Sequence, residues 1–219
     1  RLVRQRTGTI NQIRGLLLER GITAPRGPAP LRKALNGIFA EPPADLSSRM
    51  LCLIGDLALD WRTLDARIEA VSREIEMLAE NDEACQRLMT IPGIGVIISS
   101  AVVGAIGNGG AFKQGRDFAA WLGLVPKQDS TGGKTKLGGL SKRGNKYLRT
   151  LFVQAAHIVL IRKPAAAQRA LWSWIERASQ RLPHRNLLAI ALANKLARIA
   201  LAVLARNHDY HPTANTDSA

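Results

Sequence analysis

A heptad pattern between residues 50 and 78 restricts the possible fold more than any other feature. Apolar residues recur there at alternating spacings of four and three, with charged residues between them. The apolar positions are Met50, Ile54, Leu57, Trp61, Leu64, Ile68, Val71, Ile75 and Leu78. This spacing predicts one long helix over about residues 45–80. Its apolar stripe either forms a coiled coil, with another chain or with the first helix, or packs along its own domain.

The remaining segments also show helical patterns. We predict helices over about residues 1–20, 31–39, 96–106, 112–122, 165–180 and 186–206, and residues 85–89 are interpreted as the end of a helix. A further helix begins at Ser141 or Asn145 and runs to about Ile161. No alternating run indicates a strand, so residues 123–140 are predicted to be a loop rich in Gly and Lys. The predicted fold is therefore all-α, with a helical or coiled-coil region at 1–83, a helical domain at 84–207 and a disordered tail at 208–219.

Positive charge is concentrated in the second part of the chain. Residues 1–129 hold 16 Lys and Arg against 14 Asp and Glu, a balance of +2, whereas residues 130–219 hold 15 against 3, a balance of +12. No acidic residue occurs between Asp129 and Glu176. A one-sided field of this kind repels itself and favours a polyanionic partner. Nucleic acid fits better than an anionic membrane surface, because the basic residues do not line one face of a single amphipathic helix.

The pattern of cysteines indicates the compartment in which the protein occurs. Cys52 and Cys85 occur next to apolar residues in helical patterns, and we expect both to be buried free thiols. Neither a disulfide framework nor a Cys/His metal pattern is present, which is typical of a reducing, cytoplasmic compartment. No signal peptide and no membrane-spanning apolar run is expected. The sequence opens at Arg1, in the middle of a basic amphipathic pattern, and we interpret it as part of a longer protein.

The segment Ile91-Pro-Gly-Ile-Gly resembles a helix-hairpin-helix turn. Gly93 and Gly95 would allow the backbone to approach a phosphate closely, and the helix that follows would offer its free N–H groups. The alternative interpretation is a tight turn between two packed helices, in which Gly93 ends the first helix.

The segment around Ser130-Thr-Gly-Gly-Lys134 is the most informative for function. Its glycines would let the backbone wrap a phosphate, and nearby cations would neutralise adjacent phosphates without reading bases. These cations are Lys134, Lys136, Lys142, Arg143, Lys146 and Arg149. A nucleotide-binding P-loop is excluded, because position 128 is Gln where that motif needs Gly, and no strand precedes it.

Ser130 is a candidate nucleophile for a phosphodiester. An isolated serine is a weak nucleophile and needs a base, a metal or local positive charge to activate it. The neighbouring lysines would supply positive charge. Residue chemistry alone also allows a serine that serves only a turn or a helix cap.

Four ordered motifs resemble a known family. They are Leu88-Met-Thr-Ile-Pro-Gly-Ile-Gly, Phe118-Ala-Ala-Trp-Leu-Gly-Leu-Val-Pro, Ser130-Thr-Gly-Gly-Lys and Leu140-Ser-Lys-Arg-Gly-Asn-Lys-Tyr-Leu-Arg. In this order they are similar to the C-terminal domain of insertion sequence 110/116/902-type transposases, relatives of the Piv site-specific DNA invertases. The match is close over about residues 85–165, and residues 1–83 resemble that family's central coiled coil.

The resemblance implies a DNA transposase or recombinase. It implies a serine that attacks DNA, for which Ser130 is the matching position and Thr131 the alternative. It further implies an RNase H-like domain whose acidic residues bind Mg²⁺ and a guide RNA in some members. From the heptad pattern we expect a homo-oligomer formed through the coiled coil. The acidic residues Asp56, Asp60, Asp65 and Glu69 fall on the solvated side of the heptad helix, so no metal site and no cofactor is expected in this chain. We therefore expect the chain to bind DNA or RNA without recombining DNA alone.

Two other functions are compatible with the same residues. In a non-catalytic nucleic-acid-binding module, the basic loop would only hold phosphates. In a helical dimerisation module, the charge would be incidental, and nucleic-acid binding would be absent or insensitive to salt.

Overall fold

The computed structural model describes residues 1–131, 134–162 and 169–211, and it divides into two compact units, residues 1–74 and 75–219. The division falls inside one long helix, whereas the sequence analysis placed it after residue 83, just beyond the end of that helix. Helices dominate both units, which confirms the predicted all-α class.

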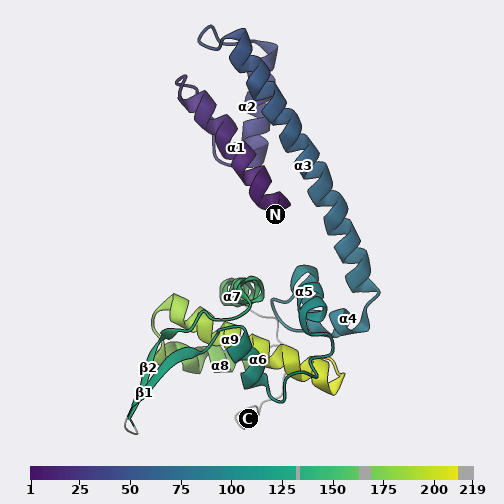
Figure 1. Ribbon diagram of the computed structural model, residues 1–219, viewed down its shortest axis with the longest axis vertical. Helices are drawn as coiled ribbons and strands as arrows, with labels where there is room; N and C mark the ends of the chain where they lie inside the picture. The colour runs from purple at the N-terminus through teal and green to yellow at the C-terminus, as the bar shows by residue number, and fades with distance from the viewer. Residues whose placement is uncertain (132–133, 163–168, 212–219) are drawn as a thin grey trace. The chain divides into compact units, whose positions relative to one another are not determined.

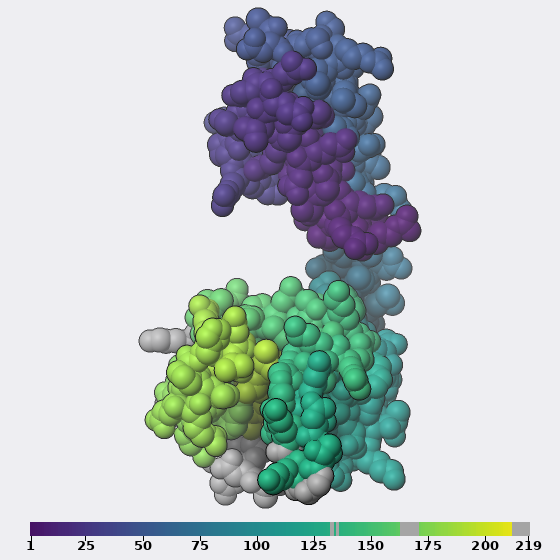
Figure 2. All heavy atoms as spheres, turned by 60° about the vertical axis from the view of Figure 1, so that its left-hand side comes forward, coloured from purple at the N-terminus to yellow at the C-terminus, as the bar shows by residue number. Residues whose placement is uncertain are grey.

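The first unit contains three helices. They are α1 (Leu2–Leu18), α2 (Pro28–Ala40) and α3 (Ser48–Glu80), of which the last continues into the second unit. The predicted long helix is confirmed. Figure 1 shows α1 and α2 side by side against the first part of α3, and Figure 2 shows α1 in purple along the surface of this unit.

Apolar residues from all three helices form the core of the first unit. Trp61 is 1% exposed and lies in this core with Ile54 and Ala58 of the same helix. Asp65, one turn further along α3, accepts hydrogen bonds from Arg6 of α1 at 3.3 Å and from Arg32 of α2 at 2.5 Å. One carboxylate thus joins all three helices.

The heptad stripe of α3 is buried only along its first part. Ile54 and Trp61 are buried, whereas Val71 and Leu78 are 43% and 64% exposed. The interpretation in which α3 packs along its own domain therefore accounts for the first part of the stripe. The coiled coil stays a prediction.

The second unit contains six helices and two strands among its described residues. They are α4 (Glu83–Met89), α5 (Val96–Ile106), α6 (Gly115–Trp121), β1 (Pro126–Thr131), β2 (Lys134–Leu140), α7 (Lys146–Ile161), α8 (Arg169–Arg181) and α9 (Arg185–Arg206). Asn145 caps α7 by accepting a hydrogen bond from the Leu148 amide at 3.0 Å, which confirms the second of the two predicted start points. The expectation of a loop over residues 123–140 is wrong, because β1 and β2 form a hairpin there.

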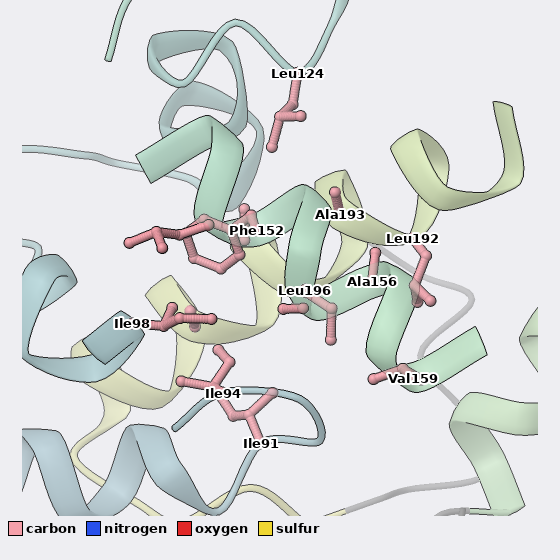
Figure 3. Packing of buried hydrophobic residues seen from close by; sticks show 14 of the residues in the cluster. Ile91, Ile94, Ile98, Leu124, Phe152, Ala156, Val159, Leu192, Ala193 and Leu196 are labelled. Carbon is pink, nitrogen blue, oxygen red and sulfur yellow. The ribbon is translucent and has the colours of Figure 1, made fainter. Parts of the chain in front are cut away.

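Helix α9 is the centre of the second unit. It packs against α4, α6, α7 and α8. Figure 3 shows Leu192, Ala193 and Leu196 of α9 meeting Phe152 and Ala156 of α7. Alanines at this contact bring the two helix axes close together.

Helix α9 is also long and apolar enough to cross a membrane by length and composition. The expectation that no apolar run has this length is therefore wrong. Over half of its most apolar window, 56%, is buried inside the protein, as is common for the core helix of a globular unit.

The two cysteines differ in their environments. Cys85 is buried, and its burial, with a smaller contribution from the charge of Asp82, raises the pKa of its thiol to about 11. Cys52 is exposed, so the expectation of two buried thiols is wrong for Cys52.

The start of the predicted disordered tail lies against the second unit. Residues 208–211 are described, and the Tyr210 amide donates a hydrogen bond to Thr90 Oγ1 at 2.8 Å. Residues 212–219 lie outside the described part of the chain.

Replacing Trp61 by Ala should destabilise the first unit by about 3–5 kcal/mol, because it leaves a large cavity between three helices. Equilibrium urea unfolding, followed by the helical circular dichroism signal, measures this change. Leu59→Ala is the matched control, since Leu59 lies on the same helix but is 61% exposed. We expect the control to cost less than about 0.5 kcal/mol. Equal losses for the two variants would contradict the assignment of Trp61 to the core.

Candidate functional site

Two glycines from different motifs meet at the base of the β1–β2 hairpin. Gly123 follows α6 and Gly144 precedes α7, and both have positive φ angles, +72° and +99°. A Cβ atom on Gly123 would overlap the backbone oxygen of Arg143, and one on Gly144 would overlap that of Trp121. Only glycine permits this crossing, so one close backbone contact explains why both motifs contain a glycine at this position.

Hydrogen bonds hold this crossing in place. The backbone N–H of Asn145 donates to the Trp121 carbonyl at 3.3 Å, and the backbone N–H of Ser141 donates to the Val125 carbonyl at 2.8 Å. From outside the crossing, Asn194 of α9 donates its side-chain amide to the Leu124 carbonyl at 2.9 Å. The end of α6 and the start of α7 are thereby joined to the central helix of the unit.

Arg149, which the sequence analysis assigned to phosphate binding, takes part in the same anchoring. Its Nη1 atom donates to the Leu122 carbonyl at 2.9 Å, and the side chain is only partly exposed. That carbonyl has no net charge, so the hydrogen bond does not neutralise the guanidinium, which places a positive charge beside the base of the hairpin.

The hairpin itself extends away from the helices as an exposed ribbon (Figure 1). All six residues of β1 are exposed. The strands are antiparallel, with Gln128 opposite Leu137, Asp129 opposite Lys136, Ser130 opposite Thr135 and Thr131 opposite Lys134.

This register gives the ribbon two chemically different faces. Successive side chains on a strand point to opposite faces, and directly opposed residues share a face. The first, or hydroxyl, face carries Gln128, Ser130 and Leu137. The second, or lysine, face carries Asp129, Thr131, Lys134 and Lys136. The lysines expected to activate Ser130 therefore lie on the face with Thr131, the alternative nucleophile.

Gln128 is the direct partner of Ser130. Its Nε2 atom donates a hydrogen bond to Ser130 Oγ at 2.8 Å, which requires both side chains on one face. The sequence analysis missed Gln128 because it assigned this segment to a loop. The pair Gly132-Gly133 was an available signal, since two glycines between two strands are typical of a two-residue hairpin turn. These two glycines lie outside the described residues.

The other predicted cations lie where the ribbon joins the helices. Lys142 and Arg143 are in the segment between β2 and α7, and Lys146 is the first residue of α7; all three are exposed. Lys142 has a φ of +55°, a conformation that is uncommon for a residue with a side chain. The predicted basic residues thus divide into two groups, one on the ribbon and one at its base.

The structure does not bring Gly93 and Gly95 to the hairpin. Gly93 packs against α7, where an added Cβ atom would be 2.8 Å from the Ala155 carbonyl oxygen and from Val159 Cγ2. Ala155 is six residues beyond Arg149, or about 9 Å along the helix axis. This packing against α7 requires glycine at position 93, and a phosphate contact there stays a prediction. Gly95 is exposed at the start of α5, has open space where a Cβ would be, and no side chain caps that helix.

The described residues do not form a metal site. No group of three or more His, Cys, Asp or Glu side chains gathers as ligands anywhere in the described ranges. The acidic residues of α3 include Asp65, whose carboxylate is used by Arg6 and Arg32. That carboxylate is therefore occupied by two arginines, and the absence of a metal ion in this chain stays a prediction.

Comparison with known proteins gives one consistent result. Residues 85–173 match the model of the "Transposase IS116/IS110/IS902 family". The chain is 45% identical to a "Probable family 20 transposase" of Pseudomonas aeruginosa over 97% of its own length and 62% of that protein. It is 42% identical to the "Transposase for insertion sequence element IS1328" of Yersinia enterocolitica over 92% of its length and 59% of that protein. It is 28% identical to the "Pilin gene-inverting protein" of Moraxella bovis over 62% of its length and 41% of that protein. The chain thus spans about three fifths of the first two relatives.

Gly93→Ala should destabilise the second unit by about 2–4 kcal/mol, because it adds left-handed strain to a clash with α7. Gly95→Ala is the matched control, two residues away, and we expect its effect to stay below about 1 kcal/mol. Thermal and urea unfolding measure both. Nucleic-acid affinity is measured in parallel: a weaker affinity in Gly95→Ala at unchanged stability would support a phosphate contact at the start of α5.

Proposed function

The chain carries a transposase domain of the IS116/IS110/IS902 family over residues 85–173, and from this premise we propose that it acts in DNA transposition or site-specific recombination, with Ser130 as the attacking residue. The observation that carries the proposal is the exposed hydroxyl of Ser130 on a ribbon that is anchored at its base. An exposed ribbon can reach a bulky duplex, and an anchored base keeps the hydroxyl in a defined position.

The proposed reaction is a transfer of a phosphodiester to serine. Ser130 Oγ forms a bond to phosphorus, and the bond from phosphorus to one deoxyribose oxygen breaks. The electron pair of that bond leaves with the deoxyribose oxygen, which takes up a proton, while the proton of the serine hydroxyl passes to water. The phosphoserine ester keeps the bond energy, so that a second deoxyribose hydroxyl can displace the serine and rejoin the strands. No step is assigned to a metal ion held by this chain.

Gln128 has a defined part in this scheme. Its amide donates to Ser130 Oγ, so the serine proton stays available for transfer to an acceptor. A neutral amide cannot act as the base. As a donor, it stabilises negative charge on Oγ, both when the hydroxyl loses its proton and when Oγ leaves in the second step. In this proposal Gln128, rather than the lysines, is the residue that activates Ser130.

The lysine face and the base of the ribbon would hold the nucleic acid. Lys134, Lys136, Lys142, Arg143 and Lys146 are all exposed, and each can neutralise a phosphate. Because the lysines and Ser130 occupy opposite faces, the strand that neutralises Lys134 and Lys136 is not the strand that Ser130 attacks. Two strands on the two faces of one ribbon suit an exchange reaction. Either DNA or a guide RNA could occupy the lysine face.

The second candidate function is a nucleic-acid-binding module without catalysis. It is favoured by the absence of a metal-ligand cluster within the described ranges and by the position of the lysines away from Ser130.

In either case, the exposed apolar residues of α3, Val71 and Leu78 among them, fit association of two copies through that helix.

Ser130→Ala should abolish a covalent protein–DNA adduct, because it removes the only atom that forms the ester. DNA affinity should stay within about a factor of two, as for an exposed substitution that changes free energy by less than about 0.5 kcal/mol. Thr131→Val is the matched control on the opposite face and should keep the adduct. Adducts are trapped on paired element ends by denaturing electrophoresis, using the full chain alone and with the part of the Pseudomonas relative outside the aligned region.

Three results separate the alternatives. An adduct that survives Ser130→Ala but not Thr131→Val would move the nucleophile to Thr131. Binding without an adduct, under both conditions, would favour the non-catalytic module. Strand exchange by the chain alone would contradict the expectation that it needs a metal-binding partner.

Gln128→Leu should slow adduct formation by roughly tenfold or more at saturating DNA, because it removes a donor to Oγ at nearly constant volume. Asp129→Asn is the matched control, since Asp129 is adjacent in sequence but lies on the lysine face. Rates as a function of pH distinguish the role from a structural one: loss of the donor should shift the profile to higher pH, because the serine alkoxide becomes less stable. Equal rates and pH profiles in Gln128→Leu and the unmodified chain would refute the role.

A further inference from the structure

A second basic surface lies in the first unit, far along the chain from the hairpin. Residues 20–40 contain no Asp or Glu, and they include four basic residues, Arg20, Arg26, Arg32 and Lys33. The overall balance of +2 for residues 1–129 conceals this segment, because the acidic residues of the first unit are concentrated on α3.

The loop between α1 and α2 is held by an arginine. Arg14 Nη2 donates to the carbonyl of Pro25 at 2.6 Å and to that of Gly27 at 2.9 Å. Arg26 lies between these two carbonyls and is exposed. The loop is further restricted by Pro25 and by Pro28, the first residue of α2. Arg26 is thus presented from a rigid segment, which reduces the entropy lost on binding.

A shallow groove runs along the same loop. It has a volume of about 510 Å³ and is lined by Pro25, Pro30, Lys33, Ala34, Gly37, Ile38 and Glu41. Lys33 brings its cation beside the loop that carries Arg26, and Glu41 is the one acidic residue of the lining. The floor is apolar, so it can contact a sugar but has few groups that could read a base.

Most cations around this loop form no ion pair within the described residues. Arg6 and Arg32 are paired with Asp65, but Arg14, Arg26 and Lys33 have no carboxylate partner within the described residues. The partners of Arg14 are neutral carbonyl groups. Against these three cations the groove lining places one acidic side chain, Glu41, so the loop keeps an excess of positive charge that favours a polyanion.

We propose that the α1–α2 loop and its groove form a second nucleic-acid contact, which binds the phosphodiester backbone through Arg26 and Lys33 and does not depend on base sequence. This site goes beyond the proposed function, because it lies in the other unit and does not rest on Ser130. Phosphodiester chemistry is shared by DNA and RNA. A membrane surface fits less well, since the loop has no large exposed apolar side chain to insert.

The test is the salt dependence of binding by the full chain. In Arg26→Gln/Lys33→Gln, the slope of log K against log salt should fall by about 1.8 for a duplex and about 1.4 for a single strand, which corresponds to two lost phosphate contacts. Affinity should fall roughly tenfold or more at moderate salt. Fluorescence anisotropy with a labelled duplex of about 30 base pairs and a single-stranded RNA of about 30 nucleotides, between about 50 and 200 mM salt, measures both and distinguishes the two sources of phosphate.

Arg62→Gln/Arg67→Gln is the matched control. Both residues are exposed on α3 of the same unit, so the variant removes the same charge from a different surface. We expect an unchanged slope. Arg26→Lys/Lys33→Arg should retain wild-type binding, because it conserves charge, and circular dichroism verifies that every variant is folded.

Two results would overturn the proposal. Equal slopes for Arg26→Gln/Lys33→Gln and the control would refute it: two reduced slopes would show that only net charge matters, and two unchanged slopes that Arg26 and Lys33 contact no phosphate. Loss of binding to a polyglutamate peptide, with both nucleic acids unaffected, would assign the surface to an acidic peptide. Lys134→Gln/Lys136→Gln tests the hairpin separately, so that failure at one surface leaves the other result intact.

Discussion

The backbone crossing of Gly123 and Gly144 is the contact on which the rest of the candidate site depends. It brings the end of α6 against the start of α7 at a distance that no side chain allows. The chain between the two glycines must then leave and return through one narrow base, and an antiparallel ribbon is the simplest structure that does so. Asn194 and Arg149 complete the base by binding carbonyls that the crossing leaves unpaired. The position of Ser130 follows from this anchoring, although Ser130 itself is exposed.

The strand geometry of the ribbon places two hydroxyl side chains that are adjacent in sequence in different chemical environments. Ser130 and Thr131 are neighbours in sequence, yet strand geometry puts them on opposite faces, one with Gln128 and the other with the lysines. A hydroxyl directly among lysines would face a phosphate held by those lysines. A hydroxyl on the other face is open to a second strand. In the proposed function, a neutral hydrogen-bond donor therefore acts on Ser130, and the lysines on the opposite face would hold nucleic acid.

The sequence predicted the helices well because their apolar residues recur at helical spacing and their ends carry clear signals. Asn145 before α7 and the glycines after α1 and α5 are examples. The hairpin was missed because β1 is exposed along its whole length, so its residues do not alternate between polar and apolar. The local sequence pattern also could not predict which of the two cysteines is buried. Cys52 and Cys85 have similar apolar neighbours in sequence, and only the tertiary packing leaves one exposed. Likewise, glycine is required at position 93 for packing against Ala155, a residue more than sixty positions away, so the sequence could not separate this role from phosphate binding.

The charge distribution has a consequence for how such a chain would hold a long polyanion. Each unit has its own apolar core and its own basic surface: the α1–α2 loop in the first, and the hairpin with its base in the second. Where both surfaces bind one nucleic acid, contact at the first raises the effective concentration of the polymer at the second, so two weak sites act together. Neither surface then needs to read sequence. If both surfaces bind the backbone as proposed, sequence choice would have to come from base contacts by other parts of an assembly or from pairing with a guide strand.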